Sequence, residues 1–321
     1  FEVFAAHDIG YFFYNGGGDS QDTTFKVSEM AKKLNLPLKC IGIPKTVDND
    51  LPYTDCSPGF GSVAKYIATS TLEAGLDVRS MAETSTKVFI LEVMGRHAGW
   101  IAAASCLASE KNSEPPHIIL LPEVPFEKNK FLKEVKARVN KYNYCVIVAS
   151  EGARFKNGKF IADTGLTDAF GHQQLGGVAP VLASMVSKIG LKNHWAVADY
   201  LQRSARHIDT KTDLEQAYIL GVNAVNLAIK GKTGVMPIIK RLSNKPYRWK
   251  TDFVSLKNVA NVEKTLPKSF ISKDGYGISK KGREYLAPLI KGEATVKYKS
   301  GIPEVAVLKN SLVPKKLNNY V

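Results

Sequence analysis

The 321-residue sequence predicts an α/β fold with largely parallel sheets, and three observations support this prediction. Short runs rich in β-branched and aromatic residues alternate with amphipathic segments of helical length, which is the pattern of strands joined by helical crossovers. Hydrophobic residues make up 44% of the chain and charged residues 23%, as is usual for a globular protein with a sizeable core. Polar clusters follow the ends of the expected strands. A chain of this length is expected to form two domains.

Local composition predicts the individual elements in chain order. The aromatic run "IGYFFY" predicts a strand, and "LKCIGIP", "KVFILEVM", "HIILLP" and "YCVIVAS" are apolar runs typical of parallel strands covered on both faces. Apolar residues recur at helical spacing through "TDLEQAYILGVNAVNLAIKG", which predicts a helix of about five turns. Strands are expected at 9–14, 38–44, 87–94, 117–122, 144–150 and 194–201, and helices at 22–35, 61–76, 101–109, 174–190 and 212–231. Beyond residue 240 the pattern loosens, and "PYRWK" at 246–250 is expected in a subunit interface or a surface turn.

Polar clusters stand at the carboxyl ends of successive expected strands. They read "NGGGDS", "KTVDND", "MGRHAG", "SEGAR" and "YLQRS". In parallel α/β sheets, helix N-termini and loop ends converge at this edge, and ligands bind there. We therefore expect one site that is built from all of these clusters.

Two of the clusters indicate phosphate chemistry. The stretch "NGGGDS" leads from a strand into a helix, and such a turn offers backbone N–H groups and the positive end of the helix dipole to a phosphate. An ordinary tight turn has the same composition, so the glycines alone do not distinguish a phosphate-binding turn from a structural one. In "PKTVDNDLP", Asp48 and Asp50 can place both carboxylates at one site, one near a metal and one near a substrate hydroxyl. Lys45 and Thr46 beside them supply donors for phosphate.

Together the motifs resemble those of the phosphofructokinases. That family has a GGDGS-like turn, a [GK]-T-[IV]-D-[NG]-D loop, an E-V-M-G-R segment, an S-E-G, and an aromatic residue or His before Q-R. This sequence has "GGGDS", "KTVDND", "LEVMGRHAGW", "SEGAR" and "DYLQRSARH" in the same order over nearly its whole length, and it is most similar to the diphosphate-dependent branch. The resemblance implies the phosphofructokinase fold, with two Rossmann-like domains. It also implies reversible, Mg²⁺-dependent phosphoryl transfer from diphosphate to the 1-hydroxyl of fructose 6-phosphate, in glycolysis and gluconeogenesis.

The resemblance assigns roles to single residues. Asp48 matches the base that takes the proton of the 1-hydroxyl, and Lys45 and Arg96 match groups that neutralise charge beside it. Asp50 matches a carboxylate that helps to hold Mg²⁺, with Asp19 as a second candidate. The expected donor-binding residues are Gly17, Gly18, Asp19, Ser20 and Lys45, and the expected sugar-binding residues are Thr46, Asp48, Met94, Gly95, Arg96, Glu151, Tyr200 and Arg203, the last two at the 6-phosphate.

Two positions bear on the choice of phosphoryl donor. ATP-dependent relatives have Gly where this sequence has Asp19 and Lys45, and those glycines leave room for the α-phosphate and the nucleoside of ATP. Asp19 is expected to fill that space and repel a nucleotide, whereas Lys45 supplies a cation to the compact diphosphate. Gly18 departs from the family, which usually has a metal-binding Asp there, so the ligands of Mg²⁺ stay open.

The resemblance also divides the chain and predicts an assembly. A phosphoryl-donor domain is expected at 1–62 and 203–265, and a sugar-phosphate domain at 63–202 and 266–321. The family's first strand and its phosphate loop, G-G-x-x-[PA]-G-x-N, are expected about 100 residues upstream of the glycine turn. We therefore interpret the sequence as N-terminally incomplete and expect impaired activity from it alone. A homodimer or homotetramer is expected because the family shares its sugar sites between subunits.

Net charge and cysteine content indicate which kinds of partner and which cellular location are favoured. The net charge of +14 favours anionic partners, and because Lys and Arg are scattered, small phosphorylated substrates are favoured over nucleic acid. No apolar run approaches the roughly 20 residues of a membrane helix. Four dispersed cysteines predict reduced thiols in the cytoplasm. An ATP-dependent enzyme and a catalytically silent regulatory subunit of the same fold stay open as alternatives.

Overall fold

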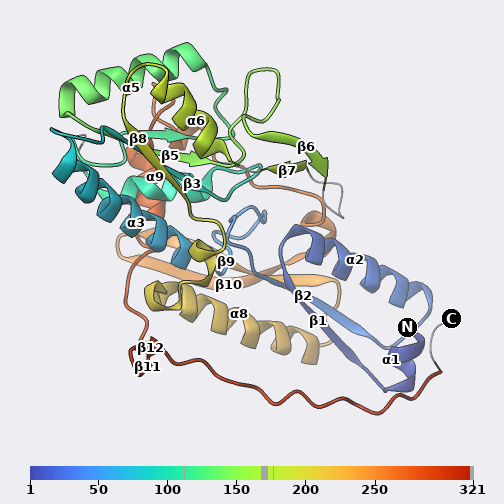
Figure 1. Cartoon of the computed structure of the whole chain (residues 1–321). Coiled ribbons are helices and arrows are strands. Elements are labelled where there is room, and N and C mark those ends of the chain that lie inside the picture. Colours follow the sequence, from blue (N-terminus) through green and yellow to red (C-terminus); the bar gives the residue numbers. More distant parts are fainter. Residues whose placement is uncertain (112, 168–172, 176, 319–321) are drawn as a thin grey trace.

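The computed structural model describes residues 1–111, 113–167, 173–175 and 177–318 and contains two four-stranded sheets, which lie one above the other in Figure 1. Neighbouring strands are parallel in both sheets except at one edge of the lower sheet. The predicted α/β class with largely parallel sheets is therefore confirmed. Within the described residues, no helix combines the length and the apolar character that a membrane span requires.

The lower sheet contains the strand that leads into the glycine turn. Its strands, in spatial order, are β1 (Tyr11–Gly16), β2 (Lys39–Pro44), β9 (Val235–Asn244) and β10 (Tyr247–Ser255). Helices α2 (Gly18–Lys33) and α8 (Lys211–Ile229) pack against it. Successive residues of a strand face opposite sides of a sheet. Accordingly, Cys40 packs in a cluster with Ala31 of α2, whereas Ile41 packs with Ala224 of α8.

The upper sheet is wholly parallel and is covered on both faces. Its strands, in spatial order, are β4 (Ile118–Leu120), β5 (Cys145–Ser150), β3 (Val88–Val93) and β8 (Asn193–Val197), and its helices are α3 (Phe60–Met81), α4 (Trp100–Ala104), α5 (Lys128–Tyr142) and α6 (Val178–Ser187). On one face, Ile147 packs with Phe131 of α5 and Leu182 of α6. On the other face, Val148 packs with Ile67 of α3. Burial on both faces explains why the predicted strands 87–94 and 144–150 are continuous apolar runs.

Several predicted boundaries differ from the structure. The helix predicted at 174–190 begins only at Val178, because Gly177 has a φ of 87° in the left-handed region and residues 173–175 form a strand. The strand predicted at 194–201 ends at Val197, and residues 201–204 form a short helix. The remaining short elements are α1 (Glu2–Ala6), η1 (Ser105–Ala108), β6 (Asp163–Thr167), β7 (Gln173–Leu175), α7 (Leu201–Ser204), η2 (Arg206–Ile208), η3 (Leu256–Asn258), η4 (Lys268–Phe270), α9 (Lys280–Leu286), β11 (Tyr298–Lys299) and β12 (Ile302–Pro303).

The β9–β10 hairpin is the main element that the sequence prediction missed. The two strands pair in an antiparallel manner from Val235 with Ser255 to Asn244 with Tyr247. The stretch "PYRWK", expected in a subunit interface or a surface turn, contains one residue of the hairpin turn, Pro246, and the first four residues of β10. β10 is an edge strand of mixed polar and apolar residues, so it lacks the apolar run that marked the buried strands. The hydroxyl of Tyr247 also points inward, because it donates to Asp55 Oδ2 at 3.3 Å.

A buried histidine next to β4 makes the stability of this fold sensitive to acid. The Nδ1 atom of His117 accepts a hydrogen bond from the Val146 backbone at 3.0 Å, and desolvation lowers the pKa of His117 from 6.5 to about 4. Between these two pH values the unfolded chain binds a proton that the native protein does not, so stability falls as the pH falls. We expect the free energy of unfolding to drop by about 3 kcal/mol from this residue between pH 6.5 and 4.

Denaturant unfolding across this pH range tests the expectation. In His117→Asn, the side-chain oxygen can accept the same N–H without titrating. The variant should therefore lose less stability in acid than the wild type. If the free energies of unfolding of the two proteins fell in parallel as the pH is lowered, groups other than His117 would cause the acid sensitivity.

Candidate active site

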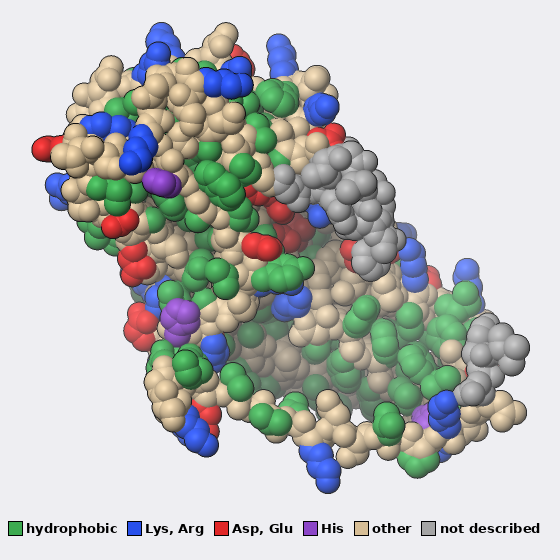
Figure 2. All heavy atoms as spheres, viewed as in Figure 1, with side chains coloured by type: hydrophobic (Ala, Val, Ile, Leu, Met, Phe, Trp, Pro, Cys, Tyr) green, Lys and Arg blue, Asp and Glu red, His purple; other side chains and the backbone are tan. Residues whose placement is uncertain are grey.

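A cavity of about 740 Å³ lies where the carboxyl ends of strands from both sheets meet. Figure 2 shows the hollow between the two halves of the molecule, with acidic side chains at its margin. Its lining includes parts of the glycine turn, of the loop after β2, of the segment after β3 and of the turn after β5. The lining residues are Gly17, Gly18, Asp19, Ser20, Thr46, Asp48, Asp50, Leu51, Arg96, His97, Ala98, Glu151, Asn261, Val262 and Glu263.

The glycine turn leads from β1 directly into α2. Gly17 is the N-cap residue, so the helix begins at Gly18, four residues earlier than predicted, and its first turn with Asp19 borders the cavity. Gln21 holds the turn from behind, because its side-chain nitrogen donates to the carbonyl oxygens of Gly16 at 2.9 Å and Ile43 at 3.1 Å. The free N–H groups of a helix N-terminus favour an anion, so this wall of the cavity suits a phosphate.

The loop after β2, residues 45–57, is called the acidic loop below. Within it, the Asp48 backbone N–H donates to Thr46 Oγ1 at 3.1 Å, and the Thr46 hydroxyl lies 3.4 Å from Asp48 Oδ2. Burial raises the pKa of Asp48, while the hydrogen bond from Thr46 and the charges of Arg96, Lys45 and Arg203 oppose the rise. A carboxylate with a raised pKa is a stronger base, which suits the predicted role of Asp48.

Within the described part of the chain, Asp50 is a buried carboxylate with a raised pKa and an unpaired oxygen. Desolvation and the neighbouring charge of Asp48 raise the pKa of Asp50 to about 6. Among the described residues, its Oδ1 atom is buried and has no hydrogen-bond partner. The described part of the chain contains no group of three or more His, Cys, Asp or Glu side chains arranged for a metal. Any Mg²⁺ held here would therefore complete its shell with water and substrate oxygens, as Mg²⁺ commonly does.

Two glycines determine the geometry of the cavity wall that the segments after β3 and β5 form. Gly95 has a φ of 128°, which a side chain would strain, and its N–H donates to Glu151 Oε1 at 3.2 Å. A Cβ atom on Gly152 would lie only 1.9 Å from the carbonyl oxygen of Arg96. These two glycines therefore allow the segments after β3 and β5 to touch, and this contact places Arg96 and Glu151 at the same cavity. Burial raises the pKa of Glu151.

Not every predicted site residue lines the cavity. Lys45, Met94, Gly95, Tyr200 and Arg203 are absent from the described lining. Tyr200 is 62% exposed, and the centre of its ring lies 4.0 Å from the guanidinium group of Arg203. The charge of Arg203 nevertheless acts on Asp48. The buried side chain of Gln202 accepts a hydrogen bond from the Met94 backbone at 3.3 Å. This bond connects α7, which contains Gln202, to the segment after β3.

The structure adds a segment that the sequence prediction missed. Residues 261–263 line the cavity and touch both halves of the molecule. Asn261 donates to Asp22 of α2 at 3.1 Å, and Glu263 lies 2.7 Å from Nδ1 of His97. The segment has no periodic pattern or motif, so nothing in the sequence marked it. From its place in the stretch "FGHQQLGG", His172 is expected either to face the cleft or to have a capping or packing role, and it lies outside the described residues.

The fold and the cavity define the class of this protein. It is an α/β protein whose parallel strands end at one polar cavity, with a phosphate-type glycine turn on one wall and paired carboxylates beside it. The family model described as "Phosphofructokinase" matches residues 1–228, and the chain belongs to the phosphofructokinase family.

Named relatives agree with this assignment. The chain is 58% identical to "Pyrophosphate--fructose 6-phosphate 1-phosphotransferase" of Halomonas elongata, over 99% of its own length and 76% of the relative's. It is similar to the crystal structure of a pyrophosphate-dependent phosphofructokinase from Marinobacter aquaeolei, with a TM-score of 0.91 and 59% identity over 99% of this chain and 76% of that one. The corresponding structure from Nitrosospira multiformis has a TM-score of 0.92 and 58% identity, over 100% and 77% of the two chains.

Proposed function

We propose that this protein transfers a phosphoryl group from diphosphate to the 1-hydroxyl of fructose 6-phosphate, giving fructose 1,6-bisphosphate and phosphate. The names of the relatives support this activity. The observation that carries it is the cavity itself, which joins the glycine turn to Asp48, Asp50, Arg96 and Glu151. Diphosphate as donor provides little driving force in either direction, so the reaction is reversible and fits both glycolysis and gluconeogenesis.

In the proposed mechanism, Asp48 accepts the proton of the sugar 1-hydroxyl. The hydroxyl oxygen forms a bond to the terminal phosphorus of diphosphate while the bridging P–O bond breaks and phosphate leaves. Lys45 and Arg96 offset the negative charge of the transferring group, and both charges already act on Asp48. In the reverse direction, protonated Asp48 returns its proton to the sugar oxygen.

Mg²⁺ is the proposed cofactor. When bound, it would neutralise charge on the diphosphate oxygens. The orphaned buried oxygen of Asp50 fits such an ion, and Asp19, which also lines the cavity, is a second candidate ligand. A Cβ atom on Gly18 would meet no atom within 4 Å, so packing alone does not exclude the metal-binding Asp that the family usually has there.

The sugar-binding roles are proposals as well. Thr46, Arg96 and Glu151 face the cavity and would contact the sugar, with the Met94–Gly95 backbone behind them. Tyr200 and Arg203 would bind the 6-phosphate from the exposed side, where both residues are exposed.

We further propose that the protein forms a homodimer or homotetramer. We also propose two domains around the two sheets, a donor domain (1–62 and 203–265) and a sugar domain (63–202 and 266–321). The four unpaired, buried cysteines support a reducing, cytoplasmic location.

A coupled assay of fructose 1,6-bisphosphate formation with each donor tests the proposed function. With Mg²⁺ and fructose 6-phosphate present, we expect turnover with diphosphate and at least tenfold lower kcat/KM with ATP, because the charge and size of the donor wall favour the smaller anion. Turnover with ATP and none with diphosphate would establish the ATP-dependent reaction instead. No turnover with either donor would contradict the proposed activity of this chain.

A further inference from the structure

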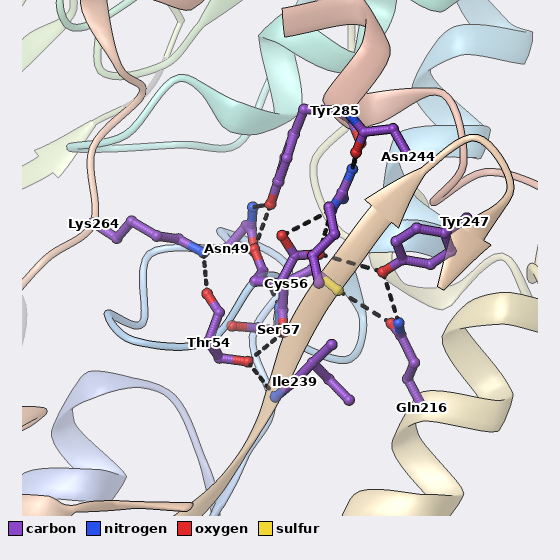
Figure 3. A network of polar contacts seen from close by, with 12 residues as sticks. Asn49, Thr54, Cys56, Ser57, Gln216, Ile239, Asn244, Tyr247, Lys264 and Tyr285 are labelled. Atoms are coloured by element: carbon purple, nitrogen blue, oxygen red, sulfur yellow. Dashed lines mark hydrogen bonds and ion pairs between the residues drawn. The ribbon is translucent and has the colours of Figure 1, made fainter. Parts of the chain in front are cut away.

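A polar network holds the acidic loop through side chains that do not line the cavity. Figure 3 shows it joining the loop to β9, to α9 and to the segment after β10 through Asn49, Thr54, Lys264 and Tyr285. None of these four side chains lines the cavity, and the reaction described above uses none of them. Their contacts nevertheless concentrate on the segment that contains Asp48 and Asp50.

Asn49 is the point at which the network reaches the two carboxylates. It stands between Asp48 and Asp50, is fully buried, and has a φ of 54°, a left-handed conformation that costs about 1 kcal/mol outside glycine. Its side-chain oxygen accepts a hydrogen bond from the Ser57 backbone at 3.0 Å, and its nitrogen donates to the Tyr285 hydroxyl at 3.1 Å. Because Asn49 is held facing inward, its two neighbours can face the cavity.

Lys264 binds the acidic loop through both its backbone and its side chain. Its backbone N–H donates to the Asp50 carbonyl oxygen at 2.6 Å. Its ammonium group donates to Asn49 Oδ1 at 3.3 Å and to the carbonyl oxygens of Thr54 at 3.0 Å and Asp55 at 3.1 Å. One residue from a distant segment therefore contacts the acidic loop at Asn49, between the two carboxylates, at Asp50, and further along at Thr54 and Asp55.

Lys264 is in turn anchored to the other half of the cavity. Its carbonyl oxygen accepts a hydrogen bond from the indole nitrogen of Trp100 at 2.8 Å, and its ammonium lies 5.3 Å from the centre of the Trp100 ring. Trp100 begins α4, the helix that follows Arg96. The lysine therefore joins the loop that contains Asp48 to the helix that begins four residues after Arg96.

We propose that Lys264 is a positioning residue, which holds the acidic loop in the conformation that points Asp48 and Asp50 into the cavity. Without its ammonium group, the Asn49 side chain and the carbonyl oxygens of Thr54 and Asp55 each lose a partner. The loop can then leave the left-handed turn at Asn49. A displacement of about 1 Å at a catalytic group can cost roughly 10²-fold in rate. The expected loss of kcat rests on the proposed function. The expected loss of order in residues 45–57 does not depend on which reaction the protein catalyses.

The test compares two lysine variants that lose the same type of contact. Lys264→Met removes the ammonium and keeps the length of the side chain. The matched control is Lys130→Met, because the ammonium of Lys130 also donates to a carbonyl oxygen, that of Asp274 at 3.0 Å, and lies 5.1 Å from an aromatic ring, that of Tyr276. Lys130 is on α5 and does not line the cavity.

Two readouts separate positioning from general stability. Hydrogen exchange without substrate should be roughly tenfold faster in residues 45–57 of Lys264→Met and unchanged there in Lys130→Met. In the diphosphate assay, kcat should fall about 10²-fold in Lys264→Met, with KM for both substrates within about fivefold of the wild type. Lys264→Gln, which keeps a neutral amide NH2 as a donor, should give intermediate values in both measurements, and it serves for the comparison if the Met variant does not fold.

Unchanged exchange in residues 45–57, or a kcat of Lys264→Met within twofold of the wild type, would overturn the proposal. Equal losses of kcat in Lys264→Met and Lys130→Met would overturn it too, since they would reflect stability alone. If the wild type itself does not turn over diphosphate, the proposed function fails, and the exchange measurement still decides whether Lys264 orders the loop.

Discussion

Replacing Asp48 by asparagine is expected to lower kcat for diphosphate-dependent phosphorylation by about 10³-fold, with KM for both substrates nearly unchanged. Asparagine has the same shape and can still accept the hydrogen bond from the Thr46 hydroxyl, so the acidic loop should keep its conformation. It cannot take a proton from the sugar hydroxyl. The loss therefore falls on the chemical step, and steady-state kinetics with varied concentrations of each substrate measures it.

A second Asp→Asn change controls for the loss of a charge. Asp252 is on the exposed β10 strand, where it pairs with Lys240 and not with any residue of the cavity. Asp252→Asn should keep the wild-type kcat, and thermal unfolding should show both variants folded. A kcat within tenfold of the wild type in Asp48→Asn would mean that the base lies elsewhere in the site.

The parts of the fold that the sequence predicted are those encoded by local patterns. The strands 38–44, 87–94 and 144–150 are continuous apolar runs because helices cover both faces of each sheet, and the structure has all three. The polar clusters after them converge for a topological reason, since parallel strands end at the same edge. This is why Arg96 and Glu151, which follow β3 and β5 of the upper sheet, line one cavity. Asp48 follows β2 of the lower sheet and joins them because the carboxyl ends of strands from both sheets meet at this cavity.

The parts that the sequence did not reveal depend on contacts between distant segments. The β9–β10 hairpin alternates exposed and half-buried residues over most of its length, which weakens its apolar signal. Residues 261–263 reach the cavity only because the chain leaves this hairpin and crosses to the upper sheet. The contacts of Lys264 with Asn49 and Trp100 join positions more than 150 residues apart, and no local rule predicts such a pairing.

Replacing both Asp19 and Lys45 by glycine is expected to shift the preference of the enzyme from diphosphate toward ATP. Asp19 lines the cavity in the first turn of α2, where its carboxylate is expected to repel an additional phosphate. Lys45 follows β2 directly, and its charge acts at Asp48, beside the transferring group. A lost hydrogen bond to a charged group costs about 1.5–3 kcal/mol. The double variant should therefore lose roughly 10²-fold in kcat/KM for diphosphate, while turnover with ATP becomes measurable.

Size and charge at position 19 can be separated by one further variant. Asp19→Asn in the Lys45→Gly background removes the negative charge and keeps nearly the same volume. If repulsion decides the donor, this variant should accept ATP almost as well as the double glycine variant. If volume decides, only the glycine at position 19 should admit the α-phosphate and the nucleoside. The ratio of kcat/KM for the two donors measures both effects. A ratio that stays within about threefold of the wild type in all of these variants would show that Asp19 and Lys45 do not set the choice of donor.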